Sequence, residues 1–228
     1  MDRRSHSLAL AGAAVVCLWA SPAAVRAQGT KTLQPVNGYA VQISPFVTGL
    51  NLALLDVLSV THRQGNNQNS LISFDLSSLP ANAVISSATL TLWADQSLDP
   101  GGDYGLATKV FRVTQPWVNW QVTWMNASGI RPSDFAAWKQ PGGDFVGINQ
   151  GLIPYSTSSL GIPDFAGDGT PGIYQMNIDV TELVNEWYNG SFPNNGMMLV
   201  GEEGNALHFH ADRGADASKY PTLTVNYR

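Results

Sequence analysis

The clearest hydrophobic pattern in the chain lies in the segment Leu71–Trp93, which alternates between apolar and polar positions twice. Two runs of alternate residues are predicted to share one face: Ile72, Phe74 and Leu76 in the first half, and Ala88, Leu90 and Leu92 in the second. Alternation with a period of two is typical of a strand that buries one face. Residues 77–82 contain the Ser, Pro and Asn of a turn. The segment therefore predicts a strand, a loop and a second strand of an all-β domain.

The same alternation recurs near the C-terminus, in the predicted strands 207–210 and 222–227. The positions expected to face the core are Leu207, Phe209, Leu223, Val225 and Tyr227. His208 and His210 would then face solvent on one strand. Residues 64–69 are rich in Gly, Asn and Gln and are predicted to form a polar turn.

One segment has helical instead of strand periodicity. Its apolar residues at helical spacing are Val180, Leu183, Val184 and Trp187. Asp179 is predicted to be the N-cap, with Glu182 three residues later completing a capping box. Asn189 and Gly190 would end this single short helix.

Periodicity disappears between residues 127 and 172, where Gly, Pro, Ser and Asp dominate. A loop of this length is uncommon in a single domain and is often functional when present. Large aromatic residues occur along it, which predicts that parts of the loop fold back onto the sandwich. They are Phe135, Trp138, Phe145, Tyr155 and Phe165.

The N-terminal residues 1–27 resemble a signal peptide, with Arg3 and Arg4 followed by the apolar run Leu8–Trp19. Cleavage is expected near Ala27, which predicts a secreted protein. The apolar run is shorter than the ~20 residues of a membrane span, so no membrane insertion is expected. The remaining residues, 28–228, have a normal length for one β-sandwich domain.

Composition limits the partners of the predicted mature chain. Removal of residues 1–27 leaves nine of the 12 basic and sixteen of the 17 acidic residues, a net charge of −7. Such a charge disfavours nucleic acid and anionic membranes as partners. The single cysteine, Cys17, would also be removed, which excludes disulfides, thiol nucleophiles and thiolate zinc sites from the mature chain.

Several segments resemble the DNRLRE domain family between Leu33 and Tyr227. The segment FDLSSLPANAVISSATLTL starts at Phe74 and is similar to the family's N-terminal signature, and further similarities occur at 117–126, 142–145 and Asp212–Arg213. Members of that family are extracellular jelly-roll β-sandwiches, some of which are classed as carbohydrate-binding modules. The resemblance therefore implies an antiparallel jelly-roll β-sandwich, to which the residue patterns add one short helix and a long Gly/Pro-rich loop insertion. Asn119 stands where the family has an acidic residue.

Catalytic motifs are weak. A glycosidase needs two carboxylates that flank a cleft, whereas Glu202 and Glu203 are adjacent and are interpreted as solvated loop charges. No Gly-x-Ser-x-Gly motif occurs. His208 and His210 have the spacing of part of a metal site, but they are interpreted as exposed polar positions of a strand. Asp164 and Asp168 are weak candidates for calcium ligands, with a plain turn as the alternative.

The predicted function is therefore that of a secreted, non-catalytic domain that binds a polysaccharide or a cell-surface glycan. The alternatives are a structural or adhesive surface protein without sugar binding, and a polysaccharide lyase or hydrolase. Trp117 and Trp124 are expected to pack in the core. Some of six candidate residues are expected to share one surface and form a shallow glycan-binding groove: Trp120, Trp138, Tyr155, His208, His210 and Arg213.

Overall fold

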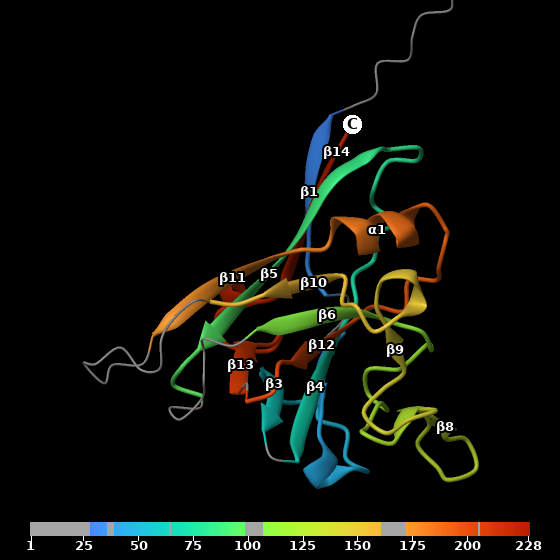
Figure 1. The fold of residues 1–228 in the computed structure, drawn as a ribbon, viewed down its shortest axis with the longest axis vertical. Coiled ribbons are helices and arrows are strands. Elements are labelled where there is room, and N and C mark those ends of the chain that lie inside the picture. The colour runs from blue at the N-terminus through green and yellow to red at the C-terminus, as the bar shows by residue number, and fades with distance from the viewer. Residues whose placement is uncertain (1–27, 36–38, 64, 99–106, 161–171, 205) are drawn as a thin grey trace, which may run out of the picture.

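The chain folds into two antiparallel β-sheets that pack face to face, with a layer of loops against one of them (Figure 1). The computed structural model describes residues 28–35, 39–63, 65–98, 107–160, 172–204 and 206–228. The predicted signal peptide and the calcium candidates Asp164 and Asp168 lie outside the described residues. Within them every strand pairing is antiparallel and one α-helix occurs, so the predicted jelly-roll β-sandwich is confirmed.

Sheet A contains the N-terminal and C-terminal strands. Its strands are β1 (Gly29–Leu33), β14 (Thr222–Tyr227), β5 (Ile85–Asp95), β11 (Ile173–Asp179), β13 (Ala206–His210) and β3 (Val57–Arg63). Sheet B contains β2 (Ala40–Ile43), β4 (Asn66–Ile72), β12 (Met197–Gly201), β6 (Thr108–Val113), β9 (Phe145–Val146) and β10 (Ser156–Ser158). A separate pair is formed by β7 (Asn126–Ser128) and β8 (Ala136–Ala137). Short 3-10 turns are η2 (Pro45–Val47), η3 (Ile148–Gln150) and η4 (Ala217–Lys219).

Strand β4 joins the two sheets. Its first residues, Asn66 to Gln68, pair with β3, and its later residues pair with β2 and β12. The prediction of a polar turn over 64–69 is therefore wrong for most of that segment. The polar side chains are held in the strand by specific partners: Asn69 Nδ2 donates to Gly142 O at 2.9 Å, and Ser70 Oγ donates to Ser59 O at 2.8 Å.

The main hydrophobic core lies between the sheets. The predicted inward positions of β5, β13 and β14 are all part of it: Ala88, Leu90, Leu92, Leu207, Phe209, Leu223 and Val225 are buried, and Tyr227 packs against them. Ile72 and Phe74 are buried in the same core, with Leu76 at its edge. The alternation in the sequence thus predicted the facing of these strands correctly.

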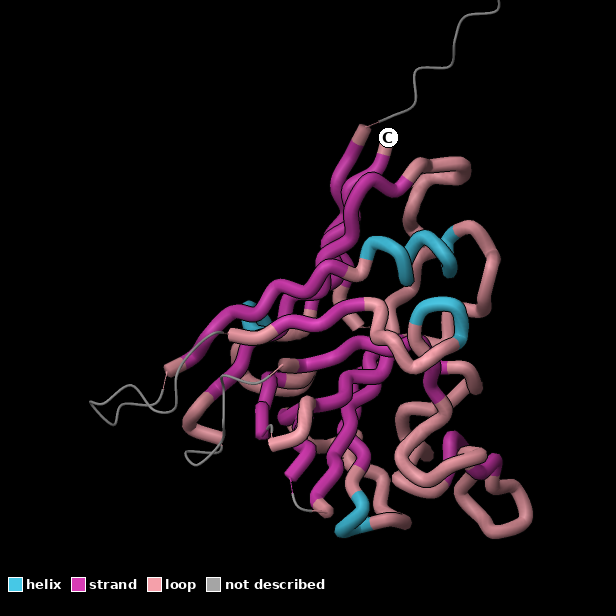
Figure 2. The backbone as a smooth tube through the Cα atoms, viewed as in Figure 1, coloured by secondary structure: helices cyan, strands magenta, loops and turns pink. Residues whose placement is uncertain are grey.

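A second hydrophobic cluster lies on the other face of sheet B. Strand β6 serves both clusters, because Val110 packs in the core between the sheets whereas Phe111 and Val113 pack in the outer cluster. Residues of the irregular segment 114–155 cover this face, including Trp117, Val122 and Trp138. The loop therefore folds back onto the sandwich as predicted, and the tube view shows how little regular structure it contains (Figure 2).

Helix α1 (Thr181–Tyr188) buries Leu183, Val184 and Trp187, as the helical spacing predicted. Its N-cap is Val180, so the predicted capping box at Asp179 is wrong. Strand β11 continues to Asp179, whose carboxylate instead accepts hydrogen bonds from the backbone N (2.9 Å) and hydroxyl (2.6 Å) of Thr181. The helix ends before Gly190, which has a φ of 72°. Among the helices of the described chain, none has the length and apolar content needed to cross a membrane.

Candidate functional site

The segment 117–126 is a compact irregular turn that separates its tryptophans. Trp117 is buried, donates from Nε1 to Asn195 O at 2.7 Å and packs edge-on against Tyr39. Thr123 Oγ1 accepts hydrogen bonds from the backbone N of Met125 and of Asn126, at 3.2 and 3.0 Å. These anchors hold the turn against sheet B while Trp120 remains 49% exposed. The expectation that Trp117 packs in the core is met, and Trp120 is the tryptophan presented to solvent.

Trp120 lies on the wall of a cavity of about 520 Å³. The volume falls within the ~300–1,000 Å³ of typical ligand pockets. The cavity is formed by loops at the end of the molecule opposite the C-terminus, where η2 and β8 lie in Figure 1. The described residues that line it are Gly49, Asn51, Trp120, Gln121, Thr123, Met125, Asn126, Gly129, Ile130 and Phe135.

One wall of the cavity is fixed by Asn51. Its Nδ2 donates to the carbonyl oxygens of Asn119 and Val122, both at 2.7 Å, and its Oδ1 accepts from the backbone N of Ala53 at 3.2 Å. The side-chain amide therefore ties the loop after β2 to the tryptophan-bearing turn. A cavity whose walls are tied in this way is formed before a ligand arrives, which reduces the entropy cost of binding.

The cavity is lined mainly by apolar side chains and by side chains with neutral amide groups. Asp, Glu, Lys and Arg are absent from the described residues that line the cavity. Phe135 and Trp120 are each about half exposed. Gln121 Oε1 accepts from the backbone N of Gly129 at 2.8 Å, which orients the amide and leaves its NH₂ group as a donor. The site can therefore offer aromatic faces and neutral hydrogen-bonding groups to a ligand.

Arg213 stacks on Trp120, with its guanidinium carbon 4.1 Å from the ring centroid. The structure thus brings together two of the predicted site residues. The neighbouring Asp212 has a pKa raised above the usual value by burial, an effect that the Arg213 charge partly opposes. Arg213 lies outside the lining of the cavity, so its main contact with the site is the support of the Trp120 ring.

Trp138 is placed in the outer hydrophobic cluster and is only 5% exposed. Its indole Nε1 donates to Thr123 O at 3.0 Å. Trp138 lies in a loop after β8, as expected, but its buried ring presents no open face to a ligand. Trp138 stabilises the turn that carries Trp120 through this hydrogen bond to Thr123.

His208 and His210 lie on the outer face of sheet A, as predicted, and do not line the Trp120 cavity. His208 Nδ1 is 3.0 Å from Ser59 Oγ. His210 Nε2 lies 3.2 Å from an Asp95 oxygen, at ion-pair distance but outside hydrogen-bond geometry. Within the part of the chain that is described, no three His, Cys, Asp or Glu side chains gather as a metal site.

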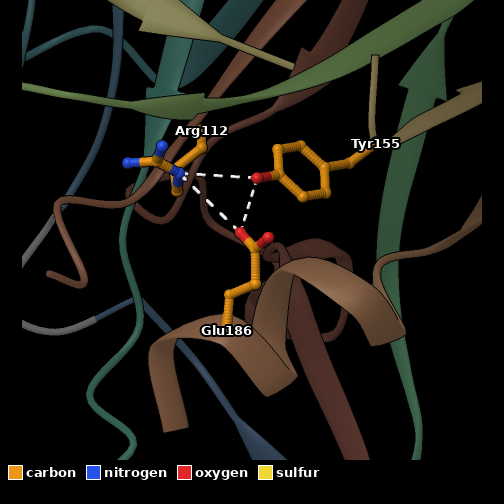
Figure 3. Close-up of polar contacts among 3 residues, drawn as sticks. All are labelled: Arg112, Tyr155 and Glu186. Carbon is orange, nitrogen blue, oxygen red and sulfur yellow. Dashed lines mark hydrogen bonds and ion pairs between the residues drawn. The ribbon is translucent and has the colours of Figure 1, made fainter. Parts of the chain in front are cut away.

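Tyr155 is half-buried in a polar cluster with Arg112 and Glu186 (Figure 3). Its hydroxyl donates to Glu186 at 2.5 Å and lies 3.5 Å from Arg112 Nε, which is 3.8 Å from the same carboxylate. Burial raises the pKa of Tyr155, and the hydrogen bond to Glu186 raises it further. Arg112 also stacks on Phe192. The cluster links three parts of the chain, which are β6, helix α1 and the segment that precedes β10. It is separate from the Trp120 cavity.

A comparison with models of protein families identifies the family of this chain. The model of the disaggregatase related repeat domain matches residues 44–225, most of the chain, so the chain belongs to that family. The resemblance to the DNRLRE domain family is therefore corrected: the short motifs that carried it occur within a different named family. No curated protein matches the chain. The family description names a type of repeat domain and no ligand.

Proposed function

We propose that the chain is a secreted, non-catalytic carbohydrate-binding domain, and that the Trp120 cavity binds an uncharged polysaccharide. The observation that carries the proposal is the half-exposed Trp120 ring on the wall of an uncharged cavity. A pyranose ring has an apolar face, and a rigid aromatic side chain covers such a face at low entropy cost.

The polar groups of the cavity support the same class of ligand. Gln121 and Asn126 offer neutral amides, which pair with sugar hydroxyls as donors and acceptors. An acidic polymer would need a cationic group in the cavity, because the predicted mature chain is itself negative. Arg213 contacts the Trp120 ring from outside the lining of the cavity, with its guanidinium stacked on that ring. The features of the site therefore favour a neutral glycan over a uronate.

The positions of the acids and imidazoles support binding without catalysis. Glu202 lies after β12, and its carboxylate accepts from the backbone N of Ala107 at 3.2 Å. His208 and Tyr155, the residue types that a lyase would use as a base, already contact Ser59 and Glu186. The side chains of Glu202, His208 and Tyr155 do not line the Trp120 cavity, where a bound sugar would need them.

A second function, adhesion to another protein, is favoured by one observation. Large aliphatic and aromatic side chains near the cavity are strongly exposed: Leu54 is 77%, Ile130 75% and Phe46 68% accessible. Exposed apolar patches mark protein interaction sites as well as ligand grooves. A protein partner would use these strongly exposed residues, whereas a sugar would use the half-exposed ring of Trp120 on the cavity wall.

A glycan array followed by affinity electrophoresis in neutral polysaccharides tests the proposal. We expect retention of residues 28–228 by at least one uncharged glycan, and Trp120→Ala should weaken it at least tenfold, about 1.4 kcal/mol. Leu54→Ser is the matched control and should leave retention unchanged. Absence of binding to every neutral glycan, or equal loss in both variants, would contradict the proposal. Release of reducing ends or unsaturated products in the same samples would contradict its non-catalytic part.

A further inference from the structure

A second, smaller cavity of about 220 Å³ involves the same turn that presents Trp120. Its wall includes Trp124, four residues after Trp120, and its lining is distinct from that of the first cavity. Thr123 and Met125 line the first cavity, whereas Trp124 between them lines the second. Successive side chains of the turn therefore line two separate cavities.

The second cavity is built on fixed backbone. Gly142 N donates to Trp124 O at 2.8 Å, and Asn69 of β4 donates to Gly142 O at 2.9 Å. A Cβ added at Gly142 would lie 2.8 Å from the Trp124 ring, so the indole lies directly against this glycine. The φ of 97° at Gly142 is also one that other residues rarely adopt. The glycine lets the backbone approach the ring closely and holds it in place.

The lining of this cavity combines aromatic and neutral polar groups. Trp124 and Phe145 supply apolar surface, and His62, Asn67 and Gln140 supply hydrogen-bonding groups. His62 Nδ1 lies 3.3 Å from Gly201 O, a contact that orients the imidazole and leaves Nε2 on its other side. Asp, Glu, Lys and Arg are absent from its described lining, as they are from that of the first cavity.

We infer that the Trp124 cavity is a second carbohydrate subsite, which takes a single sugar unit of an uncharged glycan. The inference rests on the proposed function and extends it, because it makes the domain bivalent. The smaller volume limits the second subsite to a shorter piece of ligand than the first. Two weak sites on one rigid domain bind a repeating polymer more tightly than either site binds a short sugar, through effective concentration.

Titration with methyl β-D-glucopyranoside, methyl β-D-galactopyranoside and methyl α-D-mannopyranoside tests the subsite, with the indole N–H signals of Trp120 and Trp124 followed by NMR. Tryptophan-to-phenylalanine variants assign the signals. We expect both signals to shift with at least one of these sugars, with separate dissociation constants. In Trp120→Ala the Trp124 signal should still shift with an unchanged constant. Gln140→Ala, an exposed position at the second cavity, should weaken only the Trp124 response at least threefold.

Lys139→Ala is the matched control for Gln140→Ala, because Lys139 is the exposed preceding residue and does not line the second cavity. It should leave both responses unchanged. A shift of Trp120 alone would overturn the second subsite and leave the proposed function standing. If neither signal responds to any of the sugars, and the glycan array is also negative, the proposed function itself fails. Thermal unfolding of each variant verifies that the fold is retained.

Discussion

The two faces of sheet B carry hydrophobic clusters that are built in different ways. The inner cluster packs strand against strand and includes Leu90 and Phe209. The outer cluster packs strands against an irregular loop and includes Trp117 and Trp138. The same strand, β6, contributes Val110 to one and Phe111 to the other.

The difference lies in what holds the backbone. In the inner layer continuous ladders satisfy the backbone groups, as in the β5–β11 and β5–β14 pairs. In the outer layer short backbone contacts, such as the β7–β8 pair and the bond from Gly142 N to Trp124 O, are supplemented by single side chains. The indoles of Trp117 and Trp138 each donate to a backbone carbonyl, and Asn51 donates to two. The outer layer therefore lacks long ladders within the described chain, and its loops form walls of both cavities. This arrangement agrees with the general placement of binding residues on loops that a rigid scaffold positions.

The largest expected effect comes from the inner cluster. Phe74→Ala should lower the free energy of unfolding by about 3–5 kcal/mol, because Phe74 is buried between the sheets and its removal leaves a cavity. Thr89→Ala, on the outer face of β5, should cost under ~1 kcal/mol. Urea unfolding of both variants measures the contrast. Equal costs would show that the inner cluster does not dominate stability.

A smaller and more local effect is expected in the outer cluster. Trp138→Phe keeps most of the buried ring but leaves Thr123 O without its indole donor, which should cost about 1–3 kcal/mol. Hydrogen exchange should increase for amides of β7 and β8 and remain unchanged in β5 and β14. A uniform increase across both layers would mean that the outer layer does not open independently.

The Arg112–Tyr155–Glu186 cluster allows a test by pH. Tyr155→Phe should cost about 0.5–1.5 kcal/mol at pH 7, the net contribution of one hydrogen bond. Because the pKa of Tyr155 is raised in the folded state, the unfolded chain releases this proton first, near pH 10. Stability should therefore fall as the pH rises above about 10. Urea unfolding between pH 8 and 11, in steps of about one unit, should show a smaller decline in Tyr155→Phe than in Tyr174→Phe, the control on β11.

The smallest effect on stability is expected at Arg213. Arg213→Ala removes the stacked guanidinium and should cost about 0.5–1 kcal/mol. If Arg213 only supports the ring, the affinity for a neutral glycan should fall less than in Trp120→Ala. A larger loss in Arg213→Ala would instead indicate a direct contact with the ligand. Isothermal titration of both variants with the same oligosaccharide decides between these outcomes.

The sequence predicted those elements in which the residues of one face recur at a regular spacing along the chain. The facing of His208 and His210, and the buried face of α1, follow from fixed periods of two and 3.6 residues. Trp138 and Tyr155 lie in a segment without a period, and their burial depends on contacts with distant strands. Because all three residues lie in predicted loops, sequence alone could not distinguish the buried Trp138 and half-buried Tyr155 from the exposed Trp120.

One missed element had a signal in the sequence. Arg112 occupies the same side of β6 as the core residue Val110. A charged side chain at a core-facing position indicates that it has a partner of opposite charge. Its partner Glu186 lies on α1 and could not be named from spacing. The cavity at Trp120 was equally hidden, because its walls come from loops on either side of β3 to β6.

The pairing of the two terminal strands has a mechanical consequence. Gly29 at the start of β1 pairs with Tyr227 at the end of β14. Figure 1 shows the C-terminus and one end of β1 at the same tip of the molecule. A force applied to the two ends would load the hydrogen bonds one pair at a time, so β1 would peel from β14 at low tension. If copies of the domain were joined through these ends, their cavities would point away from the tether. Tension in such an array would first load the pairing of β1 with β14.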